Sequence, residues 1–191
     1  MKKTYKVNEI FYSLQGEGYW TGTPALFLRM GLCNLRCPFC DTDFATTTPM
    51  DAEQIVEELQ KASAQCKRII ITGGEPAIQV DGALISALHA QEYTVHIETN
   101  GTLPLPEGID WVTVSPKEDW CPGATPVLTE ADEVKVVFDK ADPARWLDYI
   151  PQAPHFLQPC SCKNTEEVVT YIKSHPQWRL SLQTHKFLDI R

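Results

Sequence analysis

Short apolar segments rich in valine, isoleucine and leucine recur along the chain, separated by polar stretches that contain glycine or proline. Such short runs between turn signals are typical of β-strands. The expected strands cover residues 7–13, 24–30, 68–72, 94–99, 111–115, 133–138, 155–158 and 179–184. The pattern contains no internal repeat and no low-complexity tract.

Helical periodicity is present between some of these strands, most clearly over residues 52–65. Asp51 is suited to cap the amino end of this helix, and Gln54, three residues on, completes a capping box. The apolar face is expected to hold Ile55, Val56, Leu59 and Ala62. Further helices are expected over 81–91, 143–150 and 165–174.

Strand–helix alternation of this kind predicts an α/β fold, with a mostly parallel sheet and helices outside it. About eleven residues separate the strands at 94–99 and 111–115, too few for a full crossover helix. A complete eight-fold barrel typically needs ~250 residues, and this chain has 191. We therefore expect an open, incomplete (β/α) barrel with some helices missing, formed as a single domain over 1–191.

Unusual polar or glycine-rich segments follow five of the expected strands. They are GLCNLRCPFCDT after 24–30, TGGEP after 68–72, ETNG after 94–97, SPK after 111–114 and QPC after 155–157. In parallel α/β architectures, ligands bind at the carboxyl edge of the sheet. We therefore expect the five segments to form one large site.

Three of the seven cysteines, Cys33, Cys37 and Cys40, lie within eight residues. The odd total and this clustering fit a disulfide framework poorly and favour a metal site. Thiolates suit iron–sulfur clusters and zinc. A closed zinc site would need a fourth ligand, for which Cys160 or Cys162 is available. A [4Fe-4S] cluster held by the triad alone would keep one iron open to a cofactor.

The net charge of −8 argues against nucleic acid as the main partner. No apolar run approaches the ~20 residues of a membrane span. The basic amino end lacks the apolar core of a signal peptide. These features lead us to expect a cytoplasmic protein that binds neither membrane nor nucleic acid.

The C-x3-C-x2-C spacing, with Phe39 before the last cysteine, resembles the signature of the radical S-adenosylmethionine (SAM) superfamily. In that superfamily SAM binds the open iron, and one electron from the cluster cleaves it to methionine and a 5′-deoxyadenosyl radical. The sequence ITGGEP is similar to the family's SAM-binding motif. Its two glycines permit close approach of the backbone to a ligand, and its carboxylate can accept a hydrogen bond from an ammonium group. The cofactor contacts that the resemblance implies are Phe39, Gly74, Glu75, Ser115, Pro116, Lys117, Gln158, Pro159 and Cys160. From composition alone, SPK and QPC would mark strand ends, with Lys117 a solvated charge.

Further motifs narrow the resemblance. They are EIFYSLQGEG at 9–18, GTPA at 22–25, FLR at 27–29, CDT at 40–42 and LQTHK at 182–186. Together they resemble the 7-carboxy-7-deazaguanine synthase (QueE) family over residues 8–190. The family converts 6-carboxy-5,6,7,8-tetrahydropterin to 7-carboxy-7-deazaguanine with loss of ammonia, for queuosine, a tRNA modification, and other 7-deazapurines. The resemblance implies Mg²⁺, a homodimer and an electron donor such as flavodoxin or ferredoxin.

The resemblance also suggests which residues meet the pterin and the metal. The expected substrate contacts are Leu14, Gln15, Gly16, Arg29, Thr72, Glu98 and His185. Chemistry fits these roles, since a guanidinium grips a carboxylate at two points and an amide or carboxylate can meet the pterin's amide-like edge. The family assigns Mg²⁺ to Thr42, whose hydroxyl is a hard oxygen ligand. By composition alone, Thr42 is a turn residue, Glu98 a structural ion-pair partner and His185 a packing residue.

Two alternatives remain open at this stage. An activating enzyme for glycyl-radical proteins shares the cysteine triad but would dock a protein substrate. A non-catalytic zinc-binding module would hold zinc and no sulfide. One departure from the family is the QPCSC segment at 158–162, where we expect Cys160 and Cys162 to be free thiols rather than ligands of a second metal.

Overall fold

A single nine-stranded sheet runs through the protein. The computed structural model describes residues 2–43, 46–138 and 141–191. The strand order is β3-β1-β2-β4-β5-β6-β7-β8-β9. The strands are β1 (Tyr5–Leu14), β2 (Pro24–Met30), β3 (Thr48–Met50), β4 (Arg68–Gly73), β5 (Thr94–Thr99), β6 (Trp111–Val114), β7 (Glu133–Phe138), β8 (His155–Pro159) and β9 (Trp178–Leu180).

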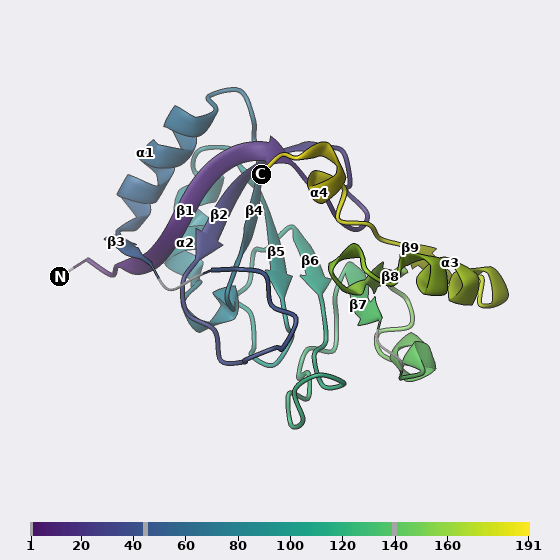
Figure 1. Ribbon diagram of the computed structural model, residues 1–191. Coiled ribbons are helices and arrows are strands. Elements are labelled where there is room, and N and C mark those ends of the chain that lie inside the picture. Colours follow the sequence, from purple (N-terminus) through teal and green to yellow (C-terminus); the bar gives the residue numbers. More distant parts are fainter. Residues whose placement is uncertain (1, 44–45, 139–140) are drawn as a thin grey trace.

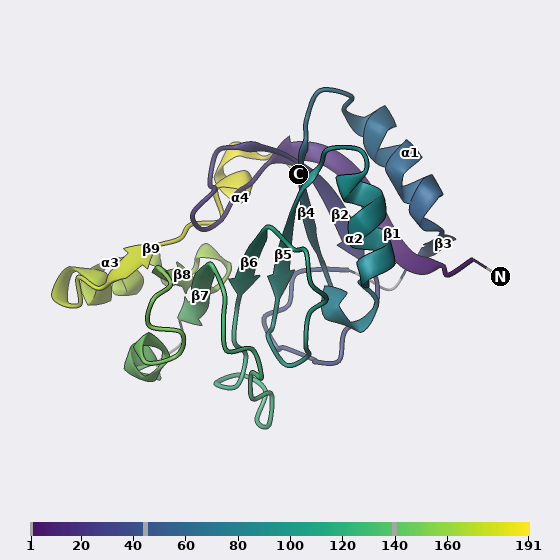
Figure 2. The same cartoon turned by 180° about the vertical axis from the view of Figure 1, so that it is seen from behind.

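The sheet is mostly parallel and does not close. Every pairing from β2 to β9 is parallel, whereas β1 is antiparallel to both β2 and β3. The edge strands β3 and β9 lie at opposite ends of the curved sheet (Figures 1 and 2). The expected open, incomplete barrel is therefore confirmed.

Helices cover the sheet unevenly. The α-helices are α1 (Ala52–Ala62), α2 (Gly82–His89), α3 (Thr165–Ser174) and α4 (Thr184–Leu188), and the 3₁₀ turns are η1 (Pro76–Ile78), η2 (Pro143–Leu147) and η3 (Cys160–Cys162). The connections β5–β6 and β6–β7 contain no helix within the described residues. The missing helix between β5 and β6 was expected from the short spacing of these strands, whereas the helix-free β6–β7 connection was not predicted.

Alternation along the strands separates a packed face from a cavity face. Leu28 on β2 and Ile71 on β4 are neighbours on the packed face, where they are buried with Ile55 of α1 and Leu84 of α2. Full burial of each such side chain stabilises the fold by about 1.5–3 kcal/mol. The alternate positions point to the concave face, where Arg29 lies beside Thr72 in the β2–β4 register.

The β1–β2 connection closes the amino-terminal end of the open barrel. Trp20 in this connection packs edge-on against Trp111, with ring centroids 5.4 Å apart, and contacts His96 at 5.3 Å. The Arg68 guanidinium lies over the Trp20 ring at 4.3 Å. Arg68 and Trp111 are the first residues of β4 and β6, so this aromatic cluster plugs the bottom of the barrel and leaves the carboxyl edge open.

Some element boundaries differ from the sequence expectation. The predicted capping box is confirmed, but α1 ends at Ala62 rather than at residue 65. The predicted helix at 143–150 is the shorter 3₁₀ turn η2, and β3 was not foreseen. The strand predicted at 179–184 is wrong beyond residue 180, because Ser181 and Gln183 turn inward to bond Gln158 and Glu17, and α4 follows.

Candidate active site

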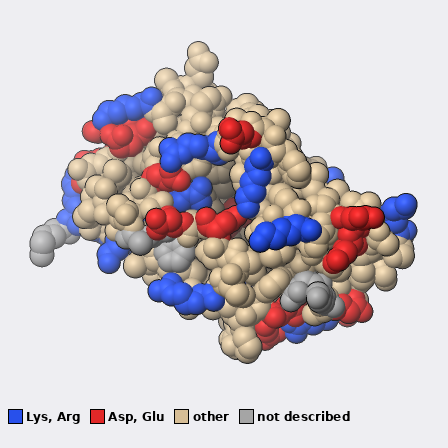
Figure 3. All heavy atoms as spheres, in the orientation of Figure 1, with Lys and Arg blue, Asp and Glu red and all other residues tan. Residues whose placement is uncertain are grey.

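A cavity of about 910 Å³ occupies the concave side of the sheet and opens at its carboxyl edge. All five segments singled out in the sequence contribute to its wall, through Cys33, Gly74, Asn100, Ser115 and Gln158 among others. Figure 3 shows a hollow on this face with charged side chains of both signs around it. Of the predicted site residues, the wall contains Leu14, Gln15, Gly16, Arg29, Cys33, Cys37, Phe39, Cys40, Thr42, Thr72, Gly74, Glu98, Ser115, Lys117, Gln158, Pro159 and His185.

The cysteine loop and the glycine turn after β4 are packed directly on each other. A side chain at Gly74 would place its Cβ 1.9 Å from the carbonyl oxygen of Leu32, so only glycine fits. The Glu75 amide donates to that same oxygen at 2.8 Å, and the Gly74 amide donates to the Met30 carbonyl at 3.1 Å. These contacts fix the amino-terminal side of the cysteine triad against the sheet.

All three cysteines of the triad line the cavity, and none of the seven cysteines forms a disulfide. Among the described residues, no three His, Cys, Asp or Glu side chains meet at one point as a mononuclear metal site requires. Each thiolate of a cubane cluster binds a different iron, so three thiols spread around one cavity suit a [4Fe-4S] cluster. The donor set therefore fits the cluster expected from the sequence.

A fourth cysteine, Cys121, lies beside the triad. Its sulfur is 3.6 Å from that of Cys37. Burial and the hydrogen-bonding contact with Cys121 raise the pKa of the Cys37 thiol to about 12. The loop that carries Cys121 also places Trp120 edge-on against Phe39, with centroids 4.5 Å apart. Sequence reasoning missed this residue because Cys121 belongs to no spacing motif.

Three predicted cofactor contacts, Glu75, Pro116 and Cys160, are absent from the cavity wall. Glu75 is fully buried, and its carboxylate accepts hydrogen bonds from Thr99 Oγ1 and the Asn100 amide, both at 2.7 Å. Its carboxylate therefore holds the loop after β5 from behind the wall. Next to Cys160, it is Ser161 that lines the cavity.

The SPK segment after β6 turns its lysine back towards the strand end. Lys117 Nζ donates to the Ser115 carbonyl at 2.6 Å and to Ser115 Oγ at 2.5 Å. Burial lowers the pKa of Lys117 to about 8. Both residues line the cavity, so the segment presents a compact polar corner beside the cysteine loop.

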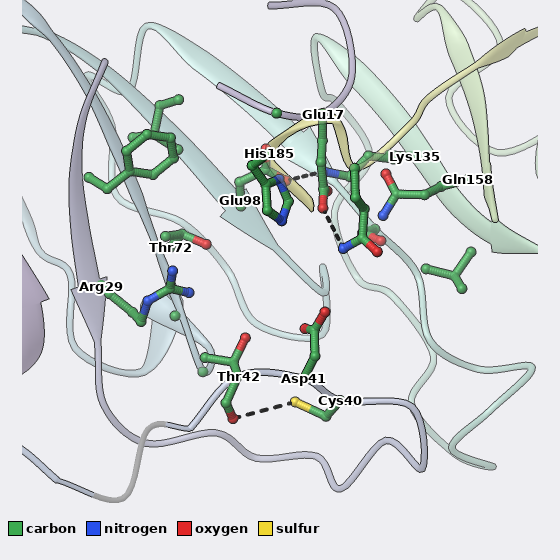
Figure 4. A pocket seen from close by; sticks show the side chains of 18 of the residues that line it. Glu17, Arg29, Cys40, Asp41, Thr42, Thr72, Glu98, Lys135, Gln158 and His185 are labelled. Atoms are coloured by element: carbon green, nitrogen blue, oxygen red, sulfur yellow. Dashed lines mark hydrogen bonds and ion pairs between the residues drawn. The ribbon is translucent and has the colours of Figure 1, made fainter. Parts of the chain in front are cut away.

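A network of buried charges forms the opposite wall (Figure 4). Lys135 Nζ lies 2.7 Å from Glu17 Oε2 and 2.8 Å from Glu98 Oε2. Gln15 Nε2 donates to Glu98 Oε1 at 3.1 Å, and Gln183 Nε2 donates to Glu17 Oε1 at 2.9 Å. Glu98 and Gln15 were predicted from the sequence, whereas Glu17, Lys135 and Gln183 were not.

The acids in this network differ in how they titrate. Burial raises the pKa of Glu98 even though Lys135 opposes the effect. Burial also opposes ionisation of Glu17, but the Lys135 ammonium outweighs it and lowers that pKa to about 2. Burial raises the pKa of Glu133 to about 7. The pKa of Lys135 is itself raised, because the surrounding carboxylates outweigh its burial.

The predicted carboxylate-binding residue, Arg29, is held from the side away from the cavity centre. Its Nε donates to Glu9 Oε1 at 2.7 Å. In Figure 4 the rest of the guanidinium points into the cavity, beside Thr72. Glu9 thus orients the fork while leaving its far side available to an anion.

The carboxyl-terminal helix α4 borders the remaining side. A side chain at Gly16 would place its Cβ 2.2 Å from His185 Nδ1, so the glycine permits the imidazole to pack on the β1–β2 connection. Burial lowers the pKa of His185. Next to it, Lys186 Nζ contacts Asp41 at 2.5 Å, which ties α4 to the segment that carries Thr42.

Comparisons with known proteins agree with this arrangement. Residues 28–117 match the model of the radical SAM superfamily. The chain is 53% identical over 186 residues to "7-carboxy-7-deazaguanine synthase" of Bacteroides thetaiotaomicron, covering 97% of this chain and 98% of the relative. A relative of the same name from Bordetella pertussis is 42% identical, over 97% and 99% of the two chains. The crystal structure of QueE from Escherichia coli superposes with a TM-score of 0.79 at 29% identity, covering 94% of this chain and 93% of the other.

Proposed function

The chain belongs to the 7-carboxy-7-deazaguanine synthase family of radical SAM enzymes, and we propose that its cavity converts 6-carboxy-5,6,7,8-tetrahydropterin to 7-carboxy-7-deazaguanine with loss of ammonia. The observation that carries this proposal is the division of the cavity into two walls. One wall holds three free thiols, and the other holds an amide and carboxylates next to a guanidinium. A radical source and a carboxylated heterocycle can therefore be bound facing each other.

The cofactor wall consists of the cysteine loop and the ends of β4, β6 and β8. When bound, the cluster and SAM supply the radical that removes a hydrogen atom from the substrate. Cys33, Cys37 and Cys40 would ligate three of the four irons. The backbone at Gly74 permits close approach of a ligand, and Ser115 offers polar groups on the same wall, whereas Gln158 lies next to Lys135 (Figure 4), where the two walls meet.

The substrate wall matches the polarity of a carboxylated pterin. Gln15 offers one acceptor and two donors to the amide-like edge. Glu98 accepts hydrogen bonds from amino and ring N–H groups. The fork of Arg29 can hold the carboxylate, which orients the adjacent carbon towards the cofactor wall. His185 would cover the ring from the side of α4.

We further propose that Mg²⁺ binds at Thr42. The threonine lines the cavity next to the cysteine loop, between the two walls. Magnesium prefers a few protein oxygens, water and oxygens from the substrate, and the Thr42 hydroxyl is such a ligand. Asp41 is already paired with Lys186, so we assign it to ordering the segment rather than to the ion.

Other features of the proposal come from the family resemblance. We infer a homodimer that receives electrons from a flavodoxin or ferredoxin, and a single radical SAM domain over 1–191. One continuous sheet through the described residues supports the last point. We also infer a cytoplasmic location, since all seven cysteines are free thiols. Among the described residues, no helix has the length and apolar character that a membrane span requires.

The decisive experiment is an anaerobic assay with SAM, a reductant, Mg²⁺ and 6-carboxytetrahydropterin. We expect 7-carboxy-7-deazaguanine by mass spectrometry and release of ammonia, and neither with Cys37→Ala. Reductive cleavage of SAM without any conversion of the pterin would contradict the proposed substrate. That result would instead favour activation of a glycyl-radical protein. Bound zinc with no labile sulfide would refute the radical SAM assignment itself.

A further inference from the structure

Lys135 is a buried cation on a strand whose other residues, apart from Glu133, are apolar, and the proposed reaction leaves it without a role. It lies on β7, and 5% of its side chain is exposed. Its ammonium bridges two carboxylates from different elements, Glu17 of the β1–β2 connection and Glu98 of β5, at 2.7 and 2.8 Å. All three residues line the cavity.

Each of the two carboxylates is held at both oxygens. Lys135 binds Oε2 of each, while Gln15 binds Oε1 of Glu98 and Gln183 binds Oε1 of Glu17. A carboxylate fixed in this way cannot rotate away from the cavity. Each oxygen can still accept a further hydrogen bond through its second lone pair.

From this geometry we propose that Lys135 is a positioning residue, which keeps the Glu17–Glu98 pair charged and aimed into the cavity to accept hydrogen bonds from the amino and ring N–H groups of the pterin. The inference rests on the proposed function and deepens it. Glu17 becomes the second acceptor of a pair in which the sequence indicated only Glu98. Lys135 itself acts through these acids and need not touch the substrate.

The physical reason is the cost of two neighbouring anions in a buried wall. Without a cation between them, one of the acids takes up a proton. A protonated acid presents an O–H donor to the donor edge of the pterin, and the mismatch leaves a buried polar group unpaired. The other charged or titratable groups that face the pair are Glu133 of β7, Lys117 after β6 and His185 of α4. Of these, Lys117 favours a charge on Glu98, whereas Glu17, the other member of the pair, disfavours it.

The test measures binding of 6-carboxypterin, a non-reactive analogue, by anaerobic calorimetry on the cluster-loaded protein with SAM, from pH 6 to pH 9. We expect Lys135→Met to bind the analogue roughly 10- to 100-fold more weakly at neutral pH, the range for losing hydrogen bonds to a charged group. The deficit relative to the parent should shrink as pH rises, because the protonated acid then ionises. Lys135→Arg should keep the pH profile of the parent, and iron content and SAM binding should be unchanged in both variants.

Two further proteins keep the test decisive. Lys173→Met removes an exposed lysine of α3 and should bind like the parent. Lys135→Met combined with Glu133→Gln removes the ammonium together with the neighbouring buried acid, so it replaces the single variant if that fails to fold, and the same weakened, pH-dependent binding is expected.

The inference would be overturned if the folded variant that carries Lys135→Met bound the analogue with the affinity and pH profile of the parent. It would also be overturned if Lys135→Arg showed the weakened, pH-dependent binding expected of Lys135→Met. The proposed function would still stand, provided the parent converts 6-carboxytetrahydropterin. If the parent neither binds the analogue nor turns over the substrate, the proposed function fails and the inference fails with it.

Discussion

At the scale of single residues, the sulfur of Cys121 lies 3.6 Å from that of Cys37, so proximity alone does not identify the cluster ligands. We expect Cys37→Ala to lose the cluster, because the triad offers no spare thiolate. Cys121→Ala should retain full iron and sulfide after anaerobic reconstitution. The measurement is iron and labile sulfide per chain together with the visible absorbance. Loss of the cluster in Cys121→Ala, with retention in Cys37→Ala, would show that Cys121 rather than Cys37 is the ligand.

Arg29 tests the assignment of the substrate carboxylate. Arg29→Lys keeps the charge but loses the fork that grips both oxygens. Loose placement of the carboxylate moves the reacting carbon, and an error of about 1 Å can cost ~100-fold in rate. We expect weaker substrate binding and a fall in kcat approaching that size, with cluster content and SAM binding near those of the parent. Turnover equal to the parent's would mean that the carboxylate is held elsewhere.

Thr42 tests the proposed magnesium site. Thr42→Ala removes a hydroxyl ligand from the ion and leaves the cysteine loop intact. Activity titrated against Mg²⁺ should therefore require higher concentrations, whereas a SAM titration should change little. Thr42→Ser keeps the hydroxyl and serves as the matched control. An identical Mg²⁺ dependence in Thr42→Ala and the parent would remove this residue from the metal site.

The motifs that identify the site in the sequence rest on rarer residue types than the site residues that could not be predicted. Cysteines and glycines at fixed spacings identify a site because their chemistry or backbone freedom is rare. Glu17, Lys135 and Gln183 are common residue types, and only the fold brings them within hydrogen-bond distance. One signal was present for Lys135, a lysine surrounded by valines in the strand EVKVVF. A charge in such a run must be paired, but the sequence does not show with what.

At the scale of elements, helix α1 has a cap whose contribution can be measured. The Asp51 carboxylate accepts from the Gln54 amide at 2.9 Å, and the Gln54 side chain accepts from the Asp51 amide at 2.9 Å. We expect Asp51→Ala to lower the free energy of unfolding by about 1 kcal/mol, within the usual range for a lost cap. Asp51→Ser should recover most of it. The measurement is urea denaturation of proteins with equal iron content. A free energy of unfolding equal to the parent's would show that the cap contributes nothing.

Elements set by local pattern could be predicted, and elements set by distant contacts could not. The β-branched run at Ile69–Ile71 is buried on both faces and reads as a strand without further information. The segment after Leu180 also has strand-like alternation, but hydrogen bonds from Ser181 to Gln158 and from Gln183 to Glu17 pull it off the sheet edge. The antiparallel direction of β1 likewise depends on how the β1–β2 connection folds over the barrel.

At the scale of the whole molecule, buried charges connect parts of the open barrel that no strand pairing joins. The β1–β2 connection crosses to β7, where the Tyr19 amide donates to Glu133 Oε2 at 3.1 Å. The same connection meets β5 through Gln15 and the carboxyl-terminal segment through Glu17. Polar contacts therefore bridge the concave side of the open barrel, and the stability of the fold should depend on their ionisation.

Glu133 allows that dependence to be tested. Its Oε1 is buried without a hydrogen-bond partner among the described residues, and burial raises its pKa from 4.5 to about 7. An acid whose pKa is higher in the folded state favours folding while it is protonated, so its contribution is complete below about pH 4.5 and is lost as pH rises to about 7. Glu133→Gln has a neutral side chain of the same shape and does not lose this contribution.

We therefore expect the Tm of Glu133→Gln to rise relative to the parent between pH 5 and pH 7, and the difference to level off above pH 7. Calorimetry under anaerobic conditions measures both proteins at each pH, so that the other titrating groups cancel in the difference. Glu130→Gln, at an exposed position before β7, is the matched control and should show no trend. A pH-independent difference in Tm for Glu133→Gln would mean that this carboxyl group has the same pKa in the folded and unfolded chains. The stability of the open barrel would then not depend on the ionisation of Glu133.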